Sequence, residues 1–346
     1  MNIPFILRKN LMLKHNSILE AIKRLNDIKF KTLIIIDNHK KICGTLTDGD
    51  IRRGLLKGYN VNSSVDLVLN KHPVINLIDR KKKQKVNYKN HDIIPSVDKY
   101  GKIKKIEIAN SVKFPSTYEH TLEIVLMAGG FGKRLMPLTR NTPKPLLKIK
   151  NKSILEMAME NFKKYGFKIF NISTYYKSCI VKKYFKKKIF SSFKIVYLEE
   201  KKPLGTAGCL SLLNYKNVKD NILVFNGDVI TDLNIINLIK FHQDTKSDIT
   251  VCAKQYSNSS LYGEICFKGH KINEIIEKPK KQNFINAGIY LIKKKMIKNM
   301  RVKYIDMPNF IDNKIKRGCS VNIYPIYEYW AEIGSKDIFK KLINKK

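Results

Sequence analysis

The sequence has few cysteines, one tryptophan and no long apolar run. Its six cysteines are scattered, with no Cys-x-x-Cys pair and no histidine at ligand spacing, which argues against a disulfide framework and a zinc site. No apolar stretch approaches the roughly 18 residues that a membrane helix needs. Met1 to Leu7 lacks the basic start and the cleavage site of a signal peptide. We therefore expect reduced thiols, no membrane insertion and a cytoplasmic protein.

Acidic residues are scarce beside basic ones, since 67 Lys and Arg against 29 Asp and Glu give a formal charge of +38. Such a charge suggests a nucleic-acid partner, because cations release counterions from phosphate backbones. However, only nine of the 67 basic residues are arginine, the preferred side chain for reading bases and phosphates. We interpret the basic runs at 80–83 and 186–188 as solvated surface and expect no specific nucleic-acid partner.

The length favours two folded parts. At 346 residues the chain exceeds one average domain, and a hydrophobic content of 43% is ordinary for a folded protein. The stretch 110–121 is polar and is interrupted by Pro115, which is typical of a linker. We predict a first part at residues 1–114, a linker at 115–121 and a second part at 122–346.

The second part opens with the strongest chemical signal in the chain. An apolar run from Ile124 to Ala128 predicts a buried strand that ends in a glycine-rich turn. A cationic pair and a lysine between two prolines follow. These residues are Gly129, Gly130, Gly132, Lys133, Arg134, Pro143, Lys144 and Pro145. A strand that ends in such a turn receives phosphates in α/β sheets, so the stretch predicts polyphosphate binding.

Two common phosphate motifs do not fit this stretch. A Walker loop requires Ser or Thr after Gly-Lys, where this chain has Arg134. A dinucleotide fingerprint requires a third glycine, where this chain has Leu135. It also requires an acidic residue after the next strand, and Asn171 to Tyr175 contains none.

Over more than twenty positions, residues 122–147 resemble the signature of the sugar-1-phosphate nucleotidyltransferases, Gly-Gly-x-Gly-x-Arg-Leu-x-Pro-Leu-Thr closing with Pro-Lys-Pro. The resemblance implies a Rossmann-like, doubly wound α/β domain with a mixed, mostly parallel sheet. The residues agree, because a helix is predicted at 154–165 and strands follow at 168–173, 194–198 and 222–225 with helical segments between them.

Later segments match the same family in order, so that roles can be assigned to individual residues. The resemblance implies that the nucleotide contacts Ala128, Gly129, Gly130, Gly132, Lys133, Gly205 and Thr206. It implies that the sugar contacts Tyr262, Gly263, Glu277, Lys278 and Asn286. Asp228 would bind Mg²⁺ together with Glu332. Two positions depart from the family: Glu332 stands where an aspartate is common, and Lys133 stands where a small hydroxyl residue is common.

The reaction implied is a single displacement at the α-phosphorus of a nucleoside triphosphate. An oxygen of the sugar 1-phosphate attacks and pyrophosphate leaves, and the sugar phosphate needs no general base. Catalysis then rests on positioning and charge neutralisation by Arg134, Lys144 and Asp228, with Lys144 and Lys278 holding the sugar phosphate.

The first part is expected to contain an internal repeat. An amphipathic helix is predicted at 16–27, where Ser17 is the cap and Glu20 completes a capping box. A strand at 32–36, a turn at 37–40 and a strand at 42–46 follow, and then a second helix. The junction Gly44-Thr-Leu-Thr-Asp-Gly-Asp in this order resembles a CBS motif.

A weaker second copy follows, with a helix at 65–69 and a hairpin at 93–103. The resemblance implies an α+β CBS pair that packs sheet against sheet. It also implies that Thr47 and Asp50 contact the phosphate and ribose of an adenine nucleotide. The alternative is that Asp48 and Asp50 only cap the helix that they begin.

The nucleotide and the sugar are less specified than the reaction. A CBS pair ahead of this domain resembles bacterial enzymes of surface-glycan synthesis, which favours GTP with glucosamine 1-phosphate or mannose 1-phosphate, and a homo-oligomer. The alternatives are a thymidylyl-, uridylyl- or cytidylyltransferase of the same family, a catalytically inactive nucleotide-sensing regulator, and a nucleic-acid binder.

Overall fold

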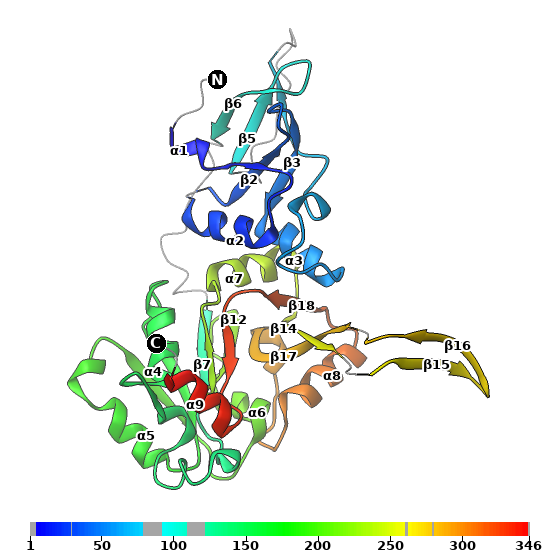
Figure 1. Ribbon diagram of the computed structural model, residues 1–346. Helices are drawn as coiled ribbons and strands as arrows, with labels where there is room; N and C mark the ends of the chain where they lie inside the picture. Colours follow the sequence, from blue (N-terminus) through cyan, green and yellow to red (C-terminus); the bar gives the residue numbers. More distant parts are fainter. Residues whose placement is uncertain are drawn as a thin grey trace. The chain divides into compact units, whose positions relative to one another are not determined.

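The computed structural model describes residues 5–28, 30–78, 92–108, 122–259, 262–278 and 280–344. The chain divides into two compact units, Met1–Pro115 (unit 1) and Ser116–Lys346 (unit 2), and each is described by itself (Figure 1). The linker predicted at 115–121 lies outside the described residues. Within them, no helix combines the length and the apolar character needed to cross a membrane.

Unit 1 is built from short helices and strands. They are α1 (Phe5–Arg8), β1 (Leu11–Leu13), α2 (Ile18–Asp27), β2 (Thr32–Ile36), β3 (Ile42–Thr47), α3 (Asp48–Leu56), the 3₁₀ turn η1 (Val65–Leu67), β4 (Asn76–Leu77), β5 (Ile93–Val97) and β6 (Ile103–Ile108). The capping box of Ser17 and Glu20 is present at the start of α2. The helix expected at 65–69 is only the single turn η1, because so short a segment does not offset the cost of starting a helix.

Unit 1 contains the same hairpin twice. The sheets β1-β2-β3 and β4-β5-β6 each pair one parallel and one antiparallel neighbour with the central strand. In the first hairpin, Asp37 accepts from the backbone N–H of His39 and Lys41 at 2.9 and 2.8 Å. In the second, Asp98 accepts from the N–H of Tyr100 and Lys102 at 3.0 and 2.9 Å. The internal repeat expected from the sequence is therefore present in this part of the structure.

The two sheets of unit 1 share one apolar core. Ile34 and Ile36 of β2 pack in the same cluster as Ile93 of β5 and Ile106 of β6. The tips of the two hairpins also pair, because the N–H of Ile42 donates to the carbonyl of Gly101 at 3.0 Å. The two sheets of unit 1 are therefore joined by one apolar core.

Unit 2 alternates strands and helices. Its helices are α4 (Ile154–Lys163), α5 (Ser178–Phe185), α6 (Gly205–Gly208), α7 (Ile235–Asp244), α8 (Met307–Lys316) and α9 (Lys336–Asn344), with 3₁₀ turns η3 (Lys133–Leu135), η4 (Lys144–Leu146), η5 (Lys188–Phe190), η6 (Cys209–Leu212) and η7 (Lys294–Ile297). Its strands are β7 (Leu122–Met127), β8 (Lys148–Ile149), β9 (Lys152–Ser153), β10 (Ile169–Thr174), β11 (Lys194–Glu199), β12 (Asn221–Asn226), β13 (Val229–Thr231), β14 (Ile249–Ser259), β15 (Glu264–Lys268), β16 (Lys271–Ile276), β17 (Lys280–Lys293), β18 (Val321–Ile326) and β19 (Trp330–Glu332).

A seven-stranded sheet forms the centre of unit 2. Its order is β11-β10-β7-β12-β17-β14-β18. The strands β11, β10, β7 and β12 are mutually parallel, whereas β17 runs antiparallel to both of its neighbours. The mixed, mostly parallel sheet expected from the sequence is confirmed.

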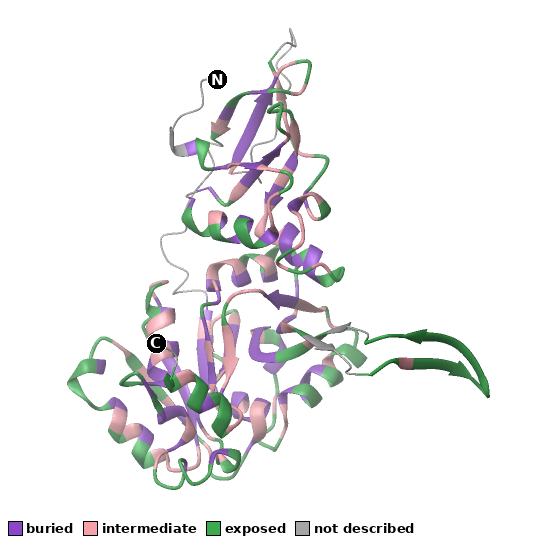
Figure 2. Cartoon of the chain, viewed as in Figure 1, coloured by how far each residue is buried: buried purple, intermediate pink, exposed green. Residues whose placement is uncertain are grey.

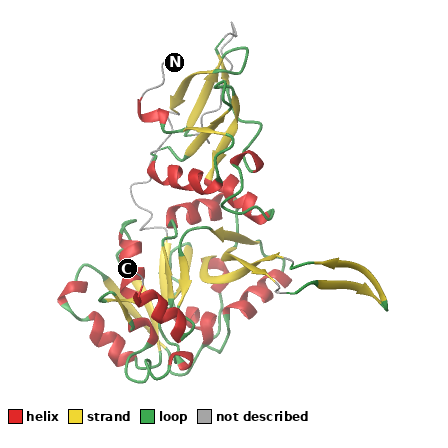
Figure 3. Cartoon of the chain, viewed as in Figure 1, coloured by secondary structure: helices red, strands yellow, loops and turns green. Residues whose placement is uncertain are grey.

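Helices cover both faces of this sheet (Figure 3). In β7, Ile124 and Leu126 join the core cluster under α4 and α5, while Val125 joins the cluster under α8. The strand β12 alternates in the same way, with Phe225 on the first side and Val224 on the second. Strands buried on both faces carry continuous apolar runs, which explains the composition of 124–128 and 222–225. Their carboxyl ends are left at one edge of the sheet.

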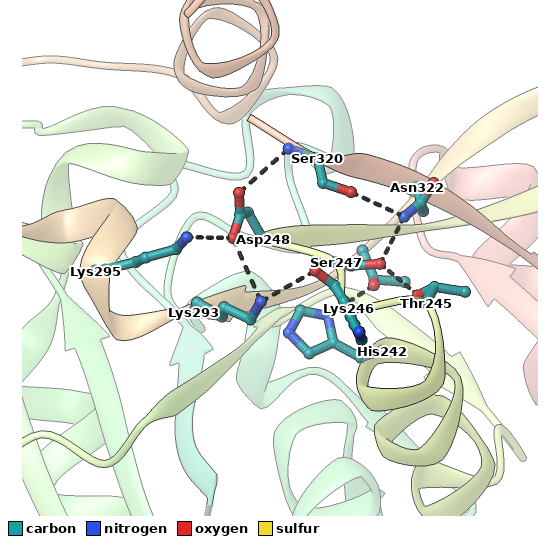
Figure 4. Close-up of polar contacts among 10 residues, drawn as sticks. His242, Thr245, Lys246, Ser247, Asp248, Lys293, Lys295, Ser320 and Asn322 are labelled. Carbon is teal, nitrogen blue, oxygen red and sulfur yellow. Dashed lines mark hydrogen bonds and ion pairs between the residues drawn. The ribbon is translucent and has the colours of Figure 1, made fainter. Parts of the chain in front are cut away.

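A polar cluster closes the end of this sheet where β14 begins (Figure 4). Asp248 accepts from Lys295 at 2.7 Å, from Lys293 at 3.4 Å and from the N–H of Ser320 at 3.2 Å. Partial burial opposes ionisation of Asp248, but these donors, Lys295 foremost, hold the pKa of its carboxyl below the usual range. The cluster joins the ends of β14, β17 and β18.

His242 lies buried beside this cluster. Its Nδ1 lies 2.8 Å from Oγ1 of Thr250 on β14, and its Nε2 has no hydrogen-bond partner among the described residues. Burial, together with the charge of Lys293, lowers the pKa of His242 from 6.5 to about 4. The imidazole is therefore neutral in the folded protein at neutral pH.

His242 predicts a pH dependence of stability. Between pH 6.5 and about 4 the unfolded chain binds a proton that the folded chain excludes. The free energy of unfolding should therefore fall as the pH drops through this window, by at most about 1.4 kcal/mol per pH unit from this group. Trp330, the only tryptophan of the chain, reports urea unfolding of unit 2 by its fluorescence.

Two variants test whether His242 causes this pH dependence of stability. His242→Asn should show a shallower loss of stability between pH 6.5 and 5 than the unaltered chain. His270→Asn, at an exposed position of the same unit, should leave the slope unchanged. An unchanged slope in His242→Asn would contradict the assignment.

Candidate active site

A cleft of about 320 Å³ opens at the carboxyl ends of β7 and β12. The loop after β7 contributes Gly129, Gly130 and Phe131, and the loop after β12 contributes Gly227 and Asp228. Ligands of open α/β sheets bind outside the carboxyl ends of the strands. The cleft therefore lies where the sequence predicts a phosphate site.

Most of the predicted nucleotide and catalytic residues surround this cleft. Six of them line it: Gly129, Gly130, Lys144, Gly205, Thr206 and Asp228. Four more lie within three positions of a lining residue in sequence without being among the lining residues: Ala128, Gly132, Lys133 and Arg134. Ala128 is fully buried, whereas the side chain of Arg134 is 75% exposed. The structure thus leaves Arg134 exposed to solvent and outside the lining of the cleft.

Two glycines are required by the backbone of the cleft. Gly132 has a φ of +64°, and a Cβ there would lie 2.9 Å from Cγ2 of Thr139. A Cβ on Gly227 would lie only 2.1 Å from the carbonyl oxygen of Met127, to which the N–H of Gly227 donates at 2.9 Å. The loops after β7 and β12 can pack this closely only with glycine at these positions.

Lys144 and Asp228 form an ion pair across the cleft. Lys144 lies in the turn η4, between the two prolines that restrict its backbone, and Asp228 follows β12. Their side chains are 13% and 20% exposed, so the pair is largely shielded from water. A pair so shielded interacts more strongly than a surface ion pair.

Two oxygens beside this ion pair have no partner. Oδ1 of Asp228 and Oδ1 of Asn226 are buried and accept no hydrogen bond from the described residues. Unpartnered buried oxygens are costly unless a ligand or ion completes them. Carboxylate and amide oxygens are also the donors that Mg²⁺ accepts, so these residues fit a hard cation.

Glu332 is adjacent to Asp228 through the backbone. Strands β13 and β19 pair Val229 with Glu332, and the N–H of Ile333 donates to the carbonyl of Asp228 at 2.9 Å. The carboxylate of Glu332 lies 3.7 Å from the guanidinium of Arg134. Among the described residues no group of three or more His, Cys, Asp or Glu side chains could hold a metal. Any Mg²⁺ here would take its remaining ligands from phosphates and water.

The five residues expected to bind the sugar do not lie together in the structure. Tyr262, Gly263, Glu277 and Lys278 are exposed and are not among the described residues that line the cleft. They lie together at the base of the β15–β16 ribbon, where Lys278 is 4.0 Å from Glu277. Local sequence resemblance marked the four positions but could not predict how the ribbon is placed.

Asn286 lies on β17, beside the cleft-lining Asn226. It accepts from the N–H of Gly288 at 3.0 Å, and a Cβ on Gly288 would lie 2.6 Å from Nδ2 of Asn226. Of the five predicted sugar residues, Asn286 is therefore the one that the described structure brings next to the cleft.

Glu200 lines the cleft but was not predicted from the sequence. It follows β11, and its carboxylate accepts from the N–H of Leu204 at 2.8 Å and from the hydroxyl of Ser173. A Cβ on Gly129 would lie 3.0 Å from Oε1 of Glu200, so the carboxylate lies against the glycine-rich loop. Its position directly after a strand and shortly before Pro203-Leu-Gly-Thr was the available signal.

Tyr304 and Asp306 also line the cleft and were also missed. Asp306 accepts from the hydroxyl of Tyr304 at 2.8 Å and from the N–H of Thr206 at 3.3 Å. The hydrogen bond to Asp306 raises the pKa of Tyr304. The contact between Asp306 and Thr206 joins segments 100 residues apart, so no local pattern could have indicated it.

In unit 1, Thr47 and Asp50 contact each other. Thr47 caps α3, its N–H donates to Oδ2 of Asp50 at 2.8 Å, and Asp50 also pairs with Arg53. Asp48 pairs instead with the buried Arg52 at 2.7 Å. Asp50 therefore has the capping role of the alternative interpretation, while Asp48 forms an ion pair within the helix.

Comparison with known proteins agrees with this geometry. The chain is 31% identical over 231 residues to the D-glycero-alpha-D-manno-heptose 1-phosphate guanylyltransferase of Campylobacter jejuni, covering 64% of this chain and all of that one. It is 29% identical over 226 residues to the mannose-1-phosphate guanylyltransferase catalytic subunit beta of Danio rerio, covering 63% of this chain. The chain spans about three fifths of the length of such mannose-1-phosphate relatives.

Solved structures match the same part of the chain. HddC from Yersinia pseudotuberculosis, also solved in complex with GMP-PN, superposes with a TM-score of 0.52 at 26% identity, over 64% of this chain and 98% of that one. The family model described as nucleotidyl transferase matches residues 123–344. With the phosphate loop, the cleft and the sheet in place, this chain belongs to the nucleotidyl transferase family.

Proposed function

We propose that the chain is a sugar-1-phosphate guanylyltransferase. The observation that carries the proposal is the shielded ion pair of Lys144 and Asp228, which lines the same cleft as the glycine-rich loop. One oxygen of Asp228 has no partner among the described residues. In the reaction, an oxygen of the sugar 1-phosphate forms a bond to the α-phosphorus of GTP. The bond from that phosphorus to the bridging oxygen breaks, and pyrophosphate leaves with the electron pair.

Several residues in and near the cleft have roles in this reaction. Backbone N–H groups of Gly129 and Gly130 approach the phosphates closely, because no side chain separates them. Lys144 holds the phosphate of the sugar, and the exposed Arg134 neutralises charge on the departing pyrophosphate. Sugar phosphates are already nucleophilic, so positioning and charge neutralisation suffice without a general base.

Magnesium is part of the proposal. Asp228 would hold it, with Glu332 on the neighbouring strand as the second carboxylate, although Glu332 is not among the lining residues of the cleft. When bound, Mg²⁺ would neutralise phosphate charge. The buried, unpartnered oxygens of Asp228 and Asn226 support this assignment.

Glu200 supports guanine as the base. A carboxylate only accepts hydrogen bonds, and guanine presents two adjacent N–H donors, at N1 and at the 2-amino group. Uracil and thymine present a single N–H between two carbonyl oxygens, which a carboxylate would repel. The names of the Campylobacter and Danio relatives, both guanylyltransferases, point in the same direction.

The sugar is proposed to have the manno configuration. The relatives are named for mannose 1-phosphate and for a manno-heptose 1-phosphate. Asn286, which lies beside the cleft, would contact the sugar. When substrate binds, the sugar is also proposed to contact the four exposed residues at the base of the ribbon, Tyr262, Gly263, Glu277 and Lys278. The nucleotide-sugar product would serve surface-glycan synthesis in the cytoplasm.

We also propose that unit 1 is a CBS pair. The repeated hairpins, with Asp37 and Asp98 in equivalent hydrogen bonds, and the core shared between two sheets support this. An adenine nucleotide would then contact Thr47 and Asp50, where the N-terminus of α3 favours an anion.

Loss of the cleft ion pair should impair catalysis. We expect Lys144→Ala and Asp228→Asn each to lower kcat/KM by roughly 10²-fold or more, the scale for removing one preorganised charged group. The measurement is pyrophosphate release, with Trp330 fluorescence to show that unit 2 remains folded. Lys148→Ala and Asp232→Asn, at exposed positions outside the cleft, are matched controls. A wild-type rate in Asp228→Asn would remove Asp228 from the site.

Glu200 should determine the base. In a screen of five nucleoside triphosphates against mannose, manno-heptose, glucosamine and glucose 1-phosphates, GTP should give the highest rate of pyrophosphate release. Glu200→Gln should lower kcat/KM for GTP by roughly 10- to 150-fold and narrow its advantage over UTP. Glu199→Gln, an exposed neighbour paired with Lys182, is the control. Equal use of all triphosphates by the unaltered enzyme would refute the guanine assignment, and no turnover with any pair would favour an inactive sensor.

The CBS proposal predicts binding of AMP or ATP to unit 1. Calorimetric titration of the full chain should detect binding that Asp50→Asn weakens at least tenfold. Glu20→Gln removes the equivalent carboxylate from the capping box of α2 and should leave the affinity unchanged. Because the triphosphate cleft also accepts nucleotides, AMP is the decisive probe. Absence of AMP binding, or equal loss in both variants, would leave unit 1 with a structural role only.

A further inference from the structure

The hairpin Glu264–Ile276, here called the arm, is exposed along nearly its whole length (Figure 2). Its strands β15 and β16 form a two-stranded sheet of their own. Paired residues of antiparallel strands lie on the same face, so the register assigns each side chain to one of two faces.

One face of the arm is apolar. Ile265 pairs with Ile275, and Phe267 pairs with Ile272. The register shifts between these two pairs, so that Asn273 is the extra residue of a bulge. Without this bulge, Ile272 and Ile275 would point to opposite faces. All four residues are more than half exposed: Ile265 by 54%, Ile275 by 63%, Phe267 by 69% and Ile272 by 53%.

The opposite face is mostly polar, with Ile276 as its apolar exception, and has no net charge. Cys266 pairs with Glu274, Lys268 with Lys271, and Glu264 with Ile276. Two glutamates and two lysines balance each other in the arm, in a chain whose formal charge is +38. The lysines lie at the tip of the arm, and Glu264 lies at its base.

A two-stranded ribbon with one exposed apolar face is marginal in water by itself. Contiguous apolar patches of this kind, with a polar reverse side, mark protein interaction sites. We propose that the apolar face of the arm packs against the same face of the arm of a second copy of this chain, forming a two-fold symmetric dimer.

Charge favours a second copy as the occupant. Most of the surface of a +38 chain repels another copy, whereas two neutral arms can approach without this cost. A two-fold axis that lays the arms antiparallel brings the lysine-bearing tip of one arm toward the Glu264-bearing base of the other. A two-fold interface also requires a self-complementary patch, which a row of Ile and Phe side chains provides.

Sedimentation velocity of the full chain tests the proposal, between about 1 and 100 µM at physiological salt. We expect a concentration-dependent dimer. Phe267→Ser should weaken it roughly 30-fold or more, the effect of removing an interface anchor. Cys266→Ser, the adjacent residue on the polar face, is the matched control and should leave the dimer unchanged. Trp330 fluorescence verifies that both variants retain folded unit 2.

A second measurement uses the unaltered chain. Hydrogen exchange of the β15 and β16 amides should slow as the protein concentration rises through the dimer transition. A chain that stays monomeric at 100 µM would overturn the proposal, as would a dimer that Phe267→Ser leaves intact. Protection of the arm that does not depend on concentration would also overturn it, since the arm would then be covered by its own chain.

Discussion

The catalytic unit depends on the burial of β7 and β12 on both faces. Val125 and Val224 pack in one core, and Leu126 and Phe225 pack in the other, so only the last residue of each strand, Met127 and Asn226, reaches the cleft. Chemistry is therefore confined to the carboxyl ends of the strands and the loops that follow them. Because the two strands are parallel neighbours, those loops meet at one edge, and Gly227 contacts the carbonyl of Met127 there.

Few of the many basic side chains of the chain lie in or near the cleft. Lys144 is held by the turn η4 and pairs with Asp228, while Arg134 is exposed and lies near Glu332. Most lysines are solvated and contribute to the field around the molecule rather than to one site. Among the described residues, Oδ1 of Asp228 has no hydrogen-bond partner, which is consistent with a site that receives a ligand.

The arm and the predicted sugar residues are connected in the chain. Tyr262 and Gly263 precede β15, and Glu277 and Lys278 follow β16, so a contact that orders the arm would also order these four residues. Assembly and sugar binding would then involve the same short segment. This arrangement differs from the phosphate loop, which is supported from both sides by the central sheet and its helices.

The sequence by itself determined the features that depend on neighbours in the chain. The strand and glycine turn at 122–132, the capping box of Ser17 and Glu20, and the two hairpins of unit 1 all follow from local patterns, because each is stabilised by residues a few positions apart. The long motif before Lys144 also indicated the phosphate site. Tertiary structure alone decided which distant segments meet. Glu200, Tyr304 and Asp306 reach the cleft because the chain returns to the same sheet edge. Such contacts depend on strand order and register, which are set by packing across the whole unit.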